Sequence, residues 1–132
     1  MSGKNTVRDY MAASLVTFTP DMDIQDAINL LVTKKISGAP VVDQHGNLVG
    51  ILSERDCMKI ALNAAYHEEM SGKVKEYMST DVKTVDAEMN IADLAELFYR
   101  EPLRRYPVFD DEGRLVGQIS RRDVLRALQE AW

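Results

Sequence analysis

The sequence carries one hairpin pattern twice: residues 40–56 read PVVDQHGNLVGILSERD, and residues 107–123 read PVFDDEGRLVGQISRRD. The two stretches align without a gap at an offset of 67 (107 minus 40). The same offset relates the opening segments Val7–Met11 and Val74–Met78, in which valine, tyrosine and methionine recur. One offset shared over so much of the chain indicates an internal duplication. A duplicated unit implies a duplicated site, and we expect a pseudo-twofold axis between the halves.

The first repeat begins with a pattern typical of a strand followed by a helix. Leu15–Thr19 alternates apolar and small polar residues, as a short strand does. Asp21 or Asp23 then offers an N-cap for a helix whose apolar positions recur at helical spacing through Ile24–Val32. Gly38 is expected to mark the end of this helix.

A hairpin and a second helix complete the first repeat. Pro40–Asp43 and Leu48–Leu52 are the expected strands, and Gly46 suits a positive φ in the turn between them. Ser53 then opens a helix that extends to about Met70. The apolar face of this helix is expected to comprise Met58, Ala61, Leu62 and Ala65.

The second repeat predicts the same order of elements. Each opening segment should form a single helical turn that lays Met11 or Met78 against the core. The expected elements are a strand at Val82–Val85, a helix at about Asn90–Arg100, a hairpin at Pro107–Ser120 that turns at residues 110–113, and a helix at Arg121–Ala131.

The fold class that follows is α+β, with two β-α-β-β-α repeats. The predicted divisions are a tail at residues 1–6, one repeat at 7–70 and the other at 71–132. Because about sixty residues bury too little surface to be stable alone, we expect the repeats to share an interface as one compact module.

Composition excludes several classes of function. The 132 residues are 45% hydrophobic and 28% charged, with a formal net charge of −5, and the pI is near 5.0. This balance is typical of a globular domain and disfavours a dedicated nucleic-acid binder. No apolar run approaches the roughly 20 residues that span a bilayer, and residues 1–6 lack the apolar core of a signal peptide. We therefore expect a cytoplasmic protein with neither nucleic acid nor membrane as a partner.

Metal and redox chemistry are not expected. His45 and His67 stand apart, so no cluster has metal-ligand spacing. The single cysteine, Cys57, has no partner for an internal disulfide. We expect Cys57 to pack in a helix as a small hydrophobe, and a reactive thiol is the alternative.

Each hairpin ends in the tetrapeptide Ser-x-Arg-Asp, at Ser53–Asp56 and Ser120–Asp123. Here a strand passes into a helix, where free backbone N–H groups and the helix dipole favour an anion. The turns therefore suit a phosphate group. The alternative is a capping box, in which serine and aspartate satisfy the amides of the first helical turn.

The segments that lead into the two hairpins are the second candidate feature. Residues 36–41 and 103–108 combine small or basic residues with a proline at the start of a strand. Such a proline leaves backbone groups beside the Ser-x-x-Asp turn, where a planar base could form hydrogen bonds. A plain helix-to-strand loop is the alternative.

Taken together, these features resemble the CBS domain, the cystathionine-β-synthase-type repeat that occurs in tandem and senses adenosine ligands. The resemblance covers Val7 to about Leu128. It is carried by the Val-x-x-x-Met openings, the Pro-Val-(Val/Phe)-Asp strands, the Gly-x-Leu-Val-Gly hairpins, and the Thr17-Phe18 and Thr84-Val85 segments, together with the Ser-x-x-Asp turns.

The resemblance implies roles for particular residues. Asp56 and Asp123 would hold ribose hydroxyls, because a carboxylate can accept two hydrogen bonds from a vicinal diol. Ser53 and Ser120 would face phosphate. The remaining ligand-binding residues expected are Thr17, Lys35, Ser37, Gly38, Ala39 and Pro40 in the first repeat, and Thr84, Arg104, Arg105, Tyr106, Pro107 and Arg122 in the second.

The two sites should not be equivalent. Arg104 and Arg105, with Arg121 and Arg122, form either a phosphate clamp or a solvated face that balances the acidic loop at residues 110–112. Tyr106 either stacks on a base or fills the space that alanine leaves at the matching position of the first repeat.

The favoured hypothesis is a regulatory module, without enzymatic activity or catalytic cofactor, that binds AMP, ADP, ATP or S-adenosylmethionine between its two repeats and signals to an unidentified protein. No catalytic set can be assembled from the motifs. A homodimer is expected. The alternative from another class is a ligand-free dimeric scaffold for protein interactions, and a nucleotide-directed enzyme would need a general base that the sequence does not offer.

Overall fold

The computed structural model describes residues 5–13, 15–67 and 71–131. The chain packs into two compact units. Unit 2 is the continuous stretch Val16–Val82, whereas unit 1 combines Met1–Leu15 with Lys83–Trp132. Each unit therefore holds the hairpin of one sequence repeat and the opening segment of the other. The boundaries of the compact units therefore differ from the boundaries of the sequence repeats.

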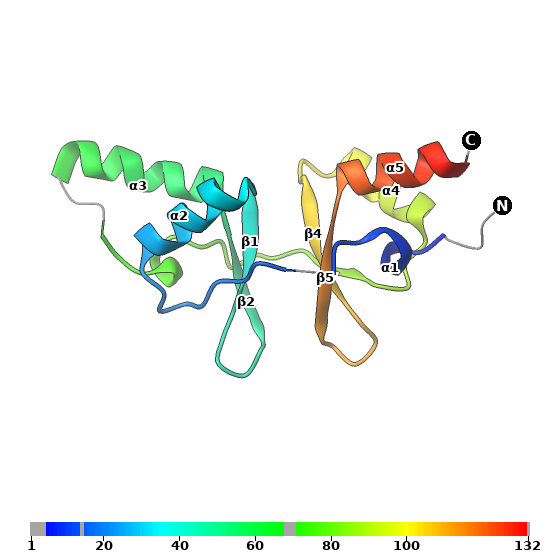
Figure 1. Ribbon diagram of the computed structural model, residues 1–132, viewed down its shortest axis with the longest axis horizontal. Coiled ribbons are helices and arrows are strands. Elements are labelled where there is room, and N and C mark those ends of the chain that lie inside the picture. The colour runs from blue at the N-terminus through cyan, green and yellow to red at the C-terminus, as the bar shows by residue number, and fades with distance from the viewer. Residues whose placement is uncertain (1–4, 14, 68–70, 132) are drawn as a thin grey trace. The chain divides into compact units, whose positions relative to one another are not determined.

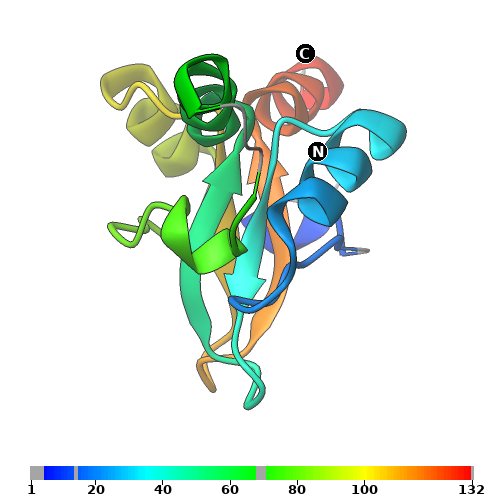
Figure 2. The same cartoon turned by 90° about the vertical axis from the view of Figure 1, so that its left-hand side faces the viewer.

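Unit 2 contains a helix, a hairpin and a second helix in the predicted order (Figure 1). Strands β1 and β2 pair antiparallel, with Pro40 opposite Ile51. Figure 2 shows the turn of this hairpin projecting away from the end that α2 and α3 cover. The elements of unit 2 are α2 (Ile24–Lys34), β1 (Gly38–Val42), β2 (Leu48–Ser53), α3 (Glu54–His67) and the 3-10 turn η1 (Val74–Glu76).

Local side-chain chemistry sets the ends of α2 and the hairpin turn. Asp23 is the N-cap, since its Oδ1 accepts a hydrogen bond from the backbone N of Gln25 at 2.8 Å. The helix ends at Lys34, because Lys35 adopts a left-handed conformation with φ of 55°. The expected end at Gly38 is wrong, and that glycine opens β1 instead. Gly46 has the positive φ expected of it, 82°.

The predicted strand at Leu15–Thr19 is reduced to one bridge, in which Phe18 pairs parallel with Val41. Beyond Phe18 the backbone turns toward the opening segment of the other repeat. There the carbonyl of Pro20 accepts from the amide of Lys75 at 3.0 Å, and the carbonyl of Met22 accepts from Val74 at 2.9 Å. The chain therefore leaves the sheet before a ladder can extend.

Unit 1 repeats the plan and adds a short parallel strand. Val85 of β3 pairs with Val108 of β4, and β4 pairs antiparallel with β5. Asn90 caps α4, accepting from the amide of Ala92 at 2.7 Å. The elements are α1 (Val7–Tyr10), β3 (Val85–Asp86), α4 (Ile91–Arg100), β4 (Arg105–Phe109), β5 (Leu115–Ser120) and α5 (Arg121–Ala131). The predicted bounds of α4 and α5 are confirmed, and the predicted strand at Val82–Val85 is shorter and begins later.

The buried face of α3 differs from the apolar face that the sequence predicts. Met58 and Leu62, assigned to the apolar face, are 61% and 66% exposed. Asp56 and Ile60, four residues apart, lie on the buried face instead. Asp56 faces inward because it closes the turn before the helix, and this fixes the rotation of the helix. The side chains of Ala61 and Ala65 lie outside the described part of the chain.

The opening segments are helical turns, as expected, and each completes the core of the unit that holds the other repeat's hairpin. Met11 packs against the unit 1 core, and Met78 packs against the unit 2 core. After each methionine the backbone pairs with the second strand of a hairpin: Ala12 bridges Gln118 in β5, and Ser79 bridges Ile51 in β2. Among the described residues, no helix combines the length and apolar character needed to cross a bilayer.

The last glycine of each Gly-x-Leu-Val-Gly motif makes room for this pairing. A Cβ on Gly117 would lie 2.7 Å from the carbonyl oxygen of Ala12 and 2.8 Å from Sδ of Met11. A Cβ on Gly50 would lie 2.9 Å from the carbonyl oxygen of Ser79 and 2.6 Å from Sδ of Met78. The methionine of each opening segment and the last glycine of each hairpin therefore recur together because they pack against each other.

We expect Gly117→Ala to lower the free energy of unfolding by about 1–3 kcal/mol, because overpacking forces the backbone of Ala12 away from β5. Urea unfolding followed by circular dichroism measures this. Gly113→Asn is the matched control: Gly113 has a φ of 77° and open space around it, and asparagine tolerates that conformation. An unchanged midpoint for Gly117→Ala would contradict the packing described above.

Candidate functional site

The turn between β2 and α3 is a closed capping box. Oδ2 of Asp56 accepts hydrogen bonds from the backbone N of Ser53 at 2.9 Å and from its Oγ at 3.0 Å. The backbone N of Asp56 in turn donates to Oγ of Ser53 at 3.1 Å. The capping alternative is therefore realised, and the serine hydroxyl proton is used within the turn.

The turn between β5 and α5 repeats this geometry. Oδ2 of Asp123 accepts from the backbone N of Ser120 at 2.9 Å and from its Oγ at 3.1 Å. The amide of Asp123 donates to Oγ of Ser120 at 3.3 Å. In both turns one carboxylate oxygen serves the cap, and the other oxygen faces elsewhere.

The second carboxylate oxygens have different neighbours. Oδ1 of Asp56 accepts from Oγ of Ser79 at 3.3 Å, and the aspartate is 8% exposed. Oδ1 of Asp123 lies 3.7 Å from Nη2 of Arg126. That guanidinium donates to the carbonyl oxygen of Tyr10 at 2.9 Å and sits 5.9 Å from the centre of the tyrosine ring. The opening segments thus reach both turns.

The lead-in segments lie beside the turns of their own units, as the sequence predicts. Gly38 pairs with Ser53, and the carbonyl of Ser37 accepts from the amide of Glu54 at 2.9 Å. Arg105 pairs with Ser120, and the carbonyl of Arg104 accepts from the amide of Arg121 at 3.1 Å. The fold therefore brings each lead-in segment to a Ser-x-x-Asp turn.

Some expected contact residues are core residues instead. Ala39 is 2% exposed, and Tyr106 is 1% exposed, packing on Phe98 with ring centres 4.8 Å apart. Pro40 and Pro107 are buried. Strand alternation turns Ala39 and Tyr106 toward the helices. Of the two alternatives for Tyr106, the structure supports core packing rather than stacking on a base. The sequence predicts that the lead-in segment leaves backbone groups available to a ligand. The carbonyl of Pro40 instead accepts a hydrogen bond from the amide of Phe18 at 2.9 Å.

Other expected site residues are at the surface. Thr17 and Thr84 are exposed and directly precede Phe18 and Val85, which pair with β1 and β4. Lys35 is exposed at the end of α2, and Arg104 and Arg122 are exposed near the unit 1 turn. Arg121 of the suggested clamp instead donates from Nε to the carbonyl of Leu103 at 2.9 Å.

Titratable groups in the described ranges offer little nucleophilic or metal chemistry. Burial raises the pKa of Cys57 to about 11, so its thiol stays protonated at neutral pH. No group of three or more histidine, cysteine, aspartate or glutamate side chains in residues 5–13, 15–67 and 71–131 could hold a metal ion.

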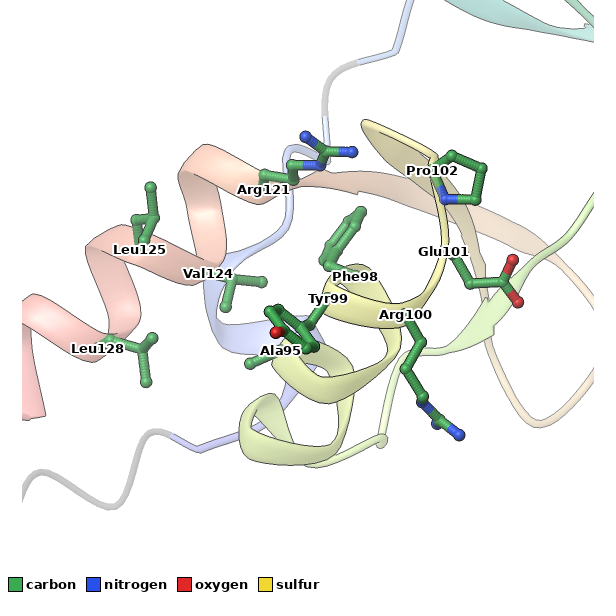
Figure 3. Close-up of a pocket in the computed structure, with 10 residues that line it drawn as sticks. All are labelled: Ala95, Phe98, Tyr99, Arg100, Glu101, Pro102, Arg121, Val124, Leu125 and Leu128. Carbon is green, nitrogen blue, oxygen red and sulfur yellow. The ribbon is translucent and has the colours of Figure 1, made fainter.

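A surface groove of about 590 Å³ lies between α4 and α5 in unit 1. Figure 3 shows Val124 and Leu128 of α5 pointing toward α4, with Arg121 at one end. Tyr99 and Leu125 at its edge are 91% and 65% exposed. The full lining is Ala95, Phe98, Tyr99, Arg100, Glu101, Pro102, Arg121, Val124, Leu125 and Leu128.

Sequence reasoning missed Ser79 and Arg126, which contact the two aspartates. One signal was present: Ser79 follows Met78 where Ala12 follows Met11, so the repeat pattern breaks at this position.

Comparison with known proteins follows the same duplication. The CBS domain family matches residues 7–63 and 74–130. An inosine-5'-monophosphate dehydrogenase of Methanocaldococcus jannaschii is 38% identical over 118 residues, which are 89% of this chain and 22% of the enzyme. The uncharacterized protein MJ1426 of the same organism is 32% identical, over 92% of this chain and 90% of the relative. The chain thus spans about a fifth of the dehydrogenase and most of the second relative.

Solved structures show the same architecture. CBSX2 of Arabidopsis thaliana in complex with AMP matches with a TM-score of 0.84 and 31% identity, over 97% of this chain and 98% of CBSX2. The CBS domain pair of protein MJ0100, in complex with 5'-methylthioadenosine and S-adenosyl-L-methionine, matches with a TM-score of 0.79 and 26% identity over 96% of this chain and 98% of the other. The protein therefore belongs to the CBS domain family and carries a tandem pair of CBS domains.

Proposed function

We propose that this protein is a regulatory module that binds an adenosine-containing ligand at its Ser-x-x-Asp turns and passes the occupancy to a partner protein. One observation carries the proposal: in both units the capping box uses one oxygen of the aspartate and leaves the other turned away from the cap. A carboxylate oxygen with spare lone pairs suits the hydroxyls of a ribose. Structures of relatives with AMP and with S-adenosyl-L-methionine support the same ligand class.

The surroundings of the two turns favour a phosphorylated ligand in unit 1. Arg104 is exposed near Ser120, whereas Ser37 stands at the matching position in unit 2. Arg122 and its match Arg55 are both exposed arginines and do not distinguish the units. Glu54 in unit 2 replaces Arg121 as well. Guanidinium groups suit phosphate oxygens, so AMP, ADP or ATP fits unit 1 better than unit 2.

Signalling follows from differential affinity. A ligand shifts a conformational equilibrium only by as much as it binds one state more tightly than the other. Each aspartate is hydrogen-bonded or ion-paired to residues from more than one element of its unit. A ligand that engages these carboxylates therefore favours one arrangement of the surrounding elements, and the partner protein binds that arrangement.

Calorimetric titration with AMP and S-adenosylmethionine tests the binding. Asp123→Asn keeps a capping acceptor but removes the charge and an acceptor site, and we expect it to weaken AMP binding about tenfold or more. Asp56→Asn, measured separately, reports the unit 2 turn. Asn90→Ala is the matched control, since it removes the cap of α4 at a cost of about 1 kcal/mol without touching either turn. AMP affinity that is identical in wild type and both aspartate variants would contradict the assignment.

We also propose that two copies associate through their helical faces. Val32 and Tyr99 occupy matching repeat positions and are 70% and 91% exposed, and Met58 and Leu125 also match, at 61% and 65%. Large exposed apolar side chains that recur on both units suit a self-complementary contact between copies. The groove between α4 and α5 offers room for such a side chain.

Leu125→Glu should convert the dimer to a monomer, because the interface would bury an unpaired charge. Analytical ultracentrifugation measures the mass, and circular dichroism verifies the fold. Gln44→Glu places the same charge on the exposed hairpin turn of unit 2, away from the helical faces, and should leave the dimer unchanged. A wild-type monomer at concentrations of tens of micromolar would refute the association.

One observation favours the ligand-free scaffold as a second candidate. Both serine hydroxyls and one oxygen of each aspartate are satisfied within the chain, so the turns need no ligand to be stable. The calorimetric titration separates the two functions: a scaffold dimerises and gives no heat with either adenosine ligand.

A further inference from the structure

The two aspartates differ in how much of their hydrogen-bonding capacity remains. An ionised carboxylate offers about four lone-pair sites. Asp56 accepts three hydrogen bonds, from the backbone N and Oγ of Ser53 and from Oγ of Ser79. Asp123 accepts two, both from Ser120. A vicinal diol that donates two hydrogen bonds therefore fits Asp123 and exceeds the capacity of Asp56 by one.

A single repeat position accounts for this difference. Ser79 exchanges both backbone hydrogen bonds with Ile51, at 2.9 Å each. Ala12 exchanges both with Gln118, at 2.9 and 3.0 Å. The backbone of the opening segment is therefore placed in the same way against both hairpins, and the hydroxyl of Ser79 accounts for the extra hydrogen bond to Asp56.

Arg126 does not replace that hydroxyl. Its Nη2 lies 3.7 Å from Oδ1 of Asp123, beyond hydrogen-bond range, and donates instead to the carbonyl of Tyr10 at 2.9 Å. The guanidinium balances the charge of Asp123 and leaves the lone pairs of Oδ1 available. Within the described residues, Oδ1 of Asp123 receives no hydrogen bond from a side chain.

We propose that position 12 of the first opening segment and position 79 of the second determine which turn takes the ribose diol. The hydroxyl of Ser79 donates to Oδ1 of Asp56 and so weakens ligand binding at that turn. Ala12 has no hydroxyl to donate to Asp123, so the diol binds first in unit 1. This inference rests on the proposed binding function. It adds a specificity-determining pair outside both Ser-x-x-Asp turns and outside both lead-in segments.

Substitutions at positions 79 and 12 test the inference. Each turn is studied alone by replacing the aspartate of the other turn with asparagine. In the Asp123→Asn background, Ser79→Ala should tighten AMP binding about three- to tenfold, the value of one net hydrogen bond. Ser79→Thr keeps the hydroxyl and should behave as Ser79 does. In the Asp56→Asn background, Ala12→Ser should weaken AMP binding by a similar factor.

A second probe separates competition for the carboxylate from a change in packing. The ribose of 2'-deoxy-AMP has one hydroxyl and donates one hydrogen bond, which either carboxylate has a lone pair to accept. Neither substitution should therefore alter the affinity for 2'-deoxy-AMP by more than about twofold. Urea unfolding of each variant verifies that its stability is retained.

The outcomes are distinct. Opposite changes for AMP at the two turns, absent with the deoxy probe, support the inference. Unchanged AMP affinity for both Ser79→Ala and Ala12→Ser, or equal changes for both probes, overturns it while the binding function stands. If wild type gives no heat with AMP or S-adenosylmethionine, the binding function fails and this inference fails with it.

Discussion

The contact between each opening segment and the last glycine of a hairpin is the constraint on which the rest of the fold depends. Because Gly50 and Gly117 carry no Cβ, the backbone at Ser79 and Ala12 can pair with β2 and β5. That pairing packs Met78 against the core of unit 2 and Met11 against the core of unit 1. It also crosses the order of the sequence, since each opening segment completes the unit that contains the other repeat's hairpin. Neither repeat then closes its core with its own residues alone, which ties the stability of the two halves together.

The Ser-x-x-Asp turn can combine its structural role with the ligand-binding role proposed above, because a carboxylate has two oxygens. Oδ2 satisfies the first amide of the turn and the serine hydroxyl, and this requirement fixes the aspartate inside the unit. In α3 it also fixes the rotation of the helix, which places Ile60 in the core and leaves Met58 and Leu62 at the surface. The remaining oxygen is held in a defined position at no further entropic cost. A ligand group that meets this oxygen binds to an acceptor that is already oriented.

Much of the fold is readable from the sequence where local chemistry decides it. Asp23 and Gly46 act over a few residues, and the helix cap, the turn and the hairpin expected there are confirmed. The failures have longer-range causes. The apolar pattern of α3 misleads because a polar residue, Asp56, faces the core. The strand at Leu15–Thr19 is cut short by hydrogen bonds to Val74 and Lys75, more than fifty residues away. Ser79 was missed for the same reason, since its contact with Asp56 spans 23 positions.

Comparison of the two units separates what the duplication holds constant from what it changes. The capping boxes, the glycine contacts and the exposed apolar positions at Val32 and Tyr99 and at Met58 and Leu125 recur in both units. Several positions in and near the two turns do not recur: Ser79 stands against Ala12, Lys59 against Arg126, and Glu54 against Arg121. Changes at such positions alter hydrogen-bond count and charge without disturbing the cap or the backbone pairing. A duplicated scaffold of this kind can therefore carry two sites of unequal affinity, which is what a sensor needs in order to respond over a wider range of ligand concentration than a single site allows.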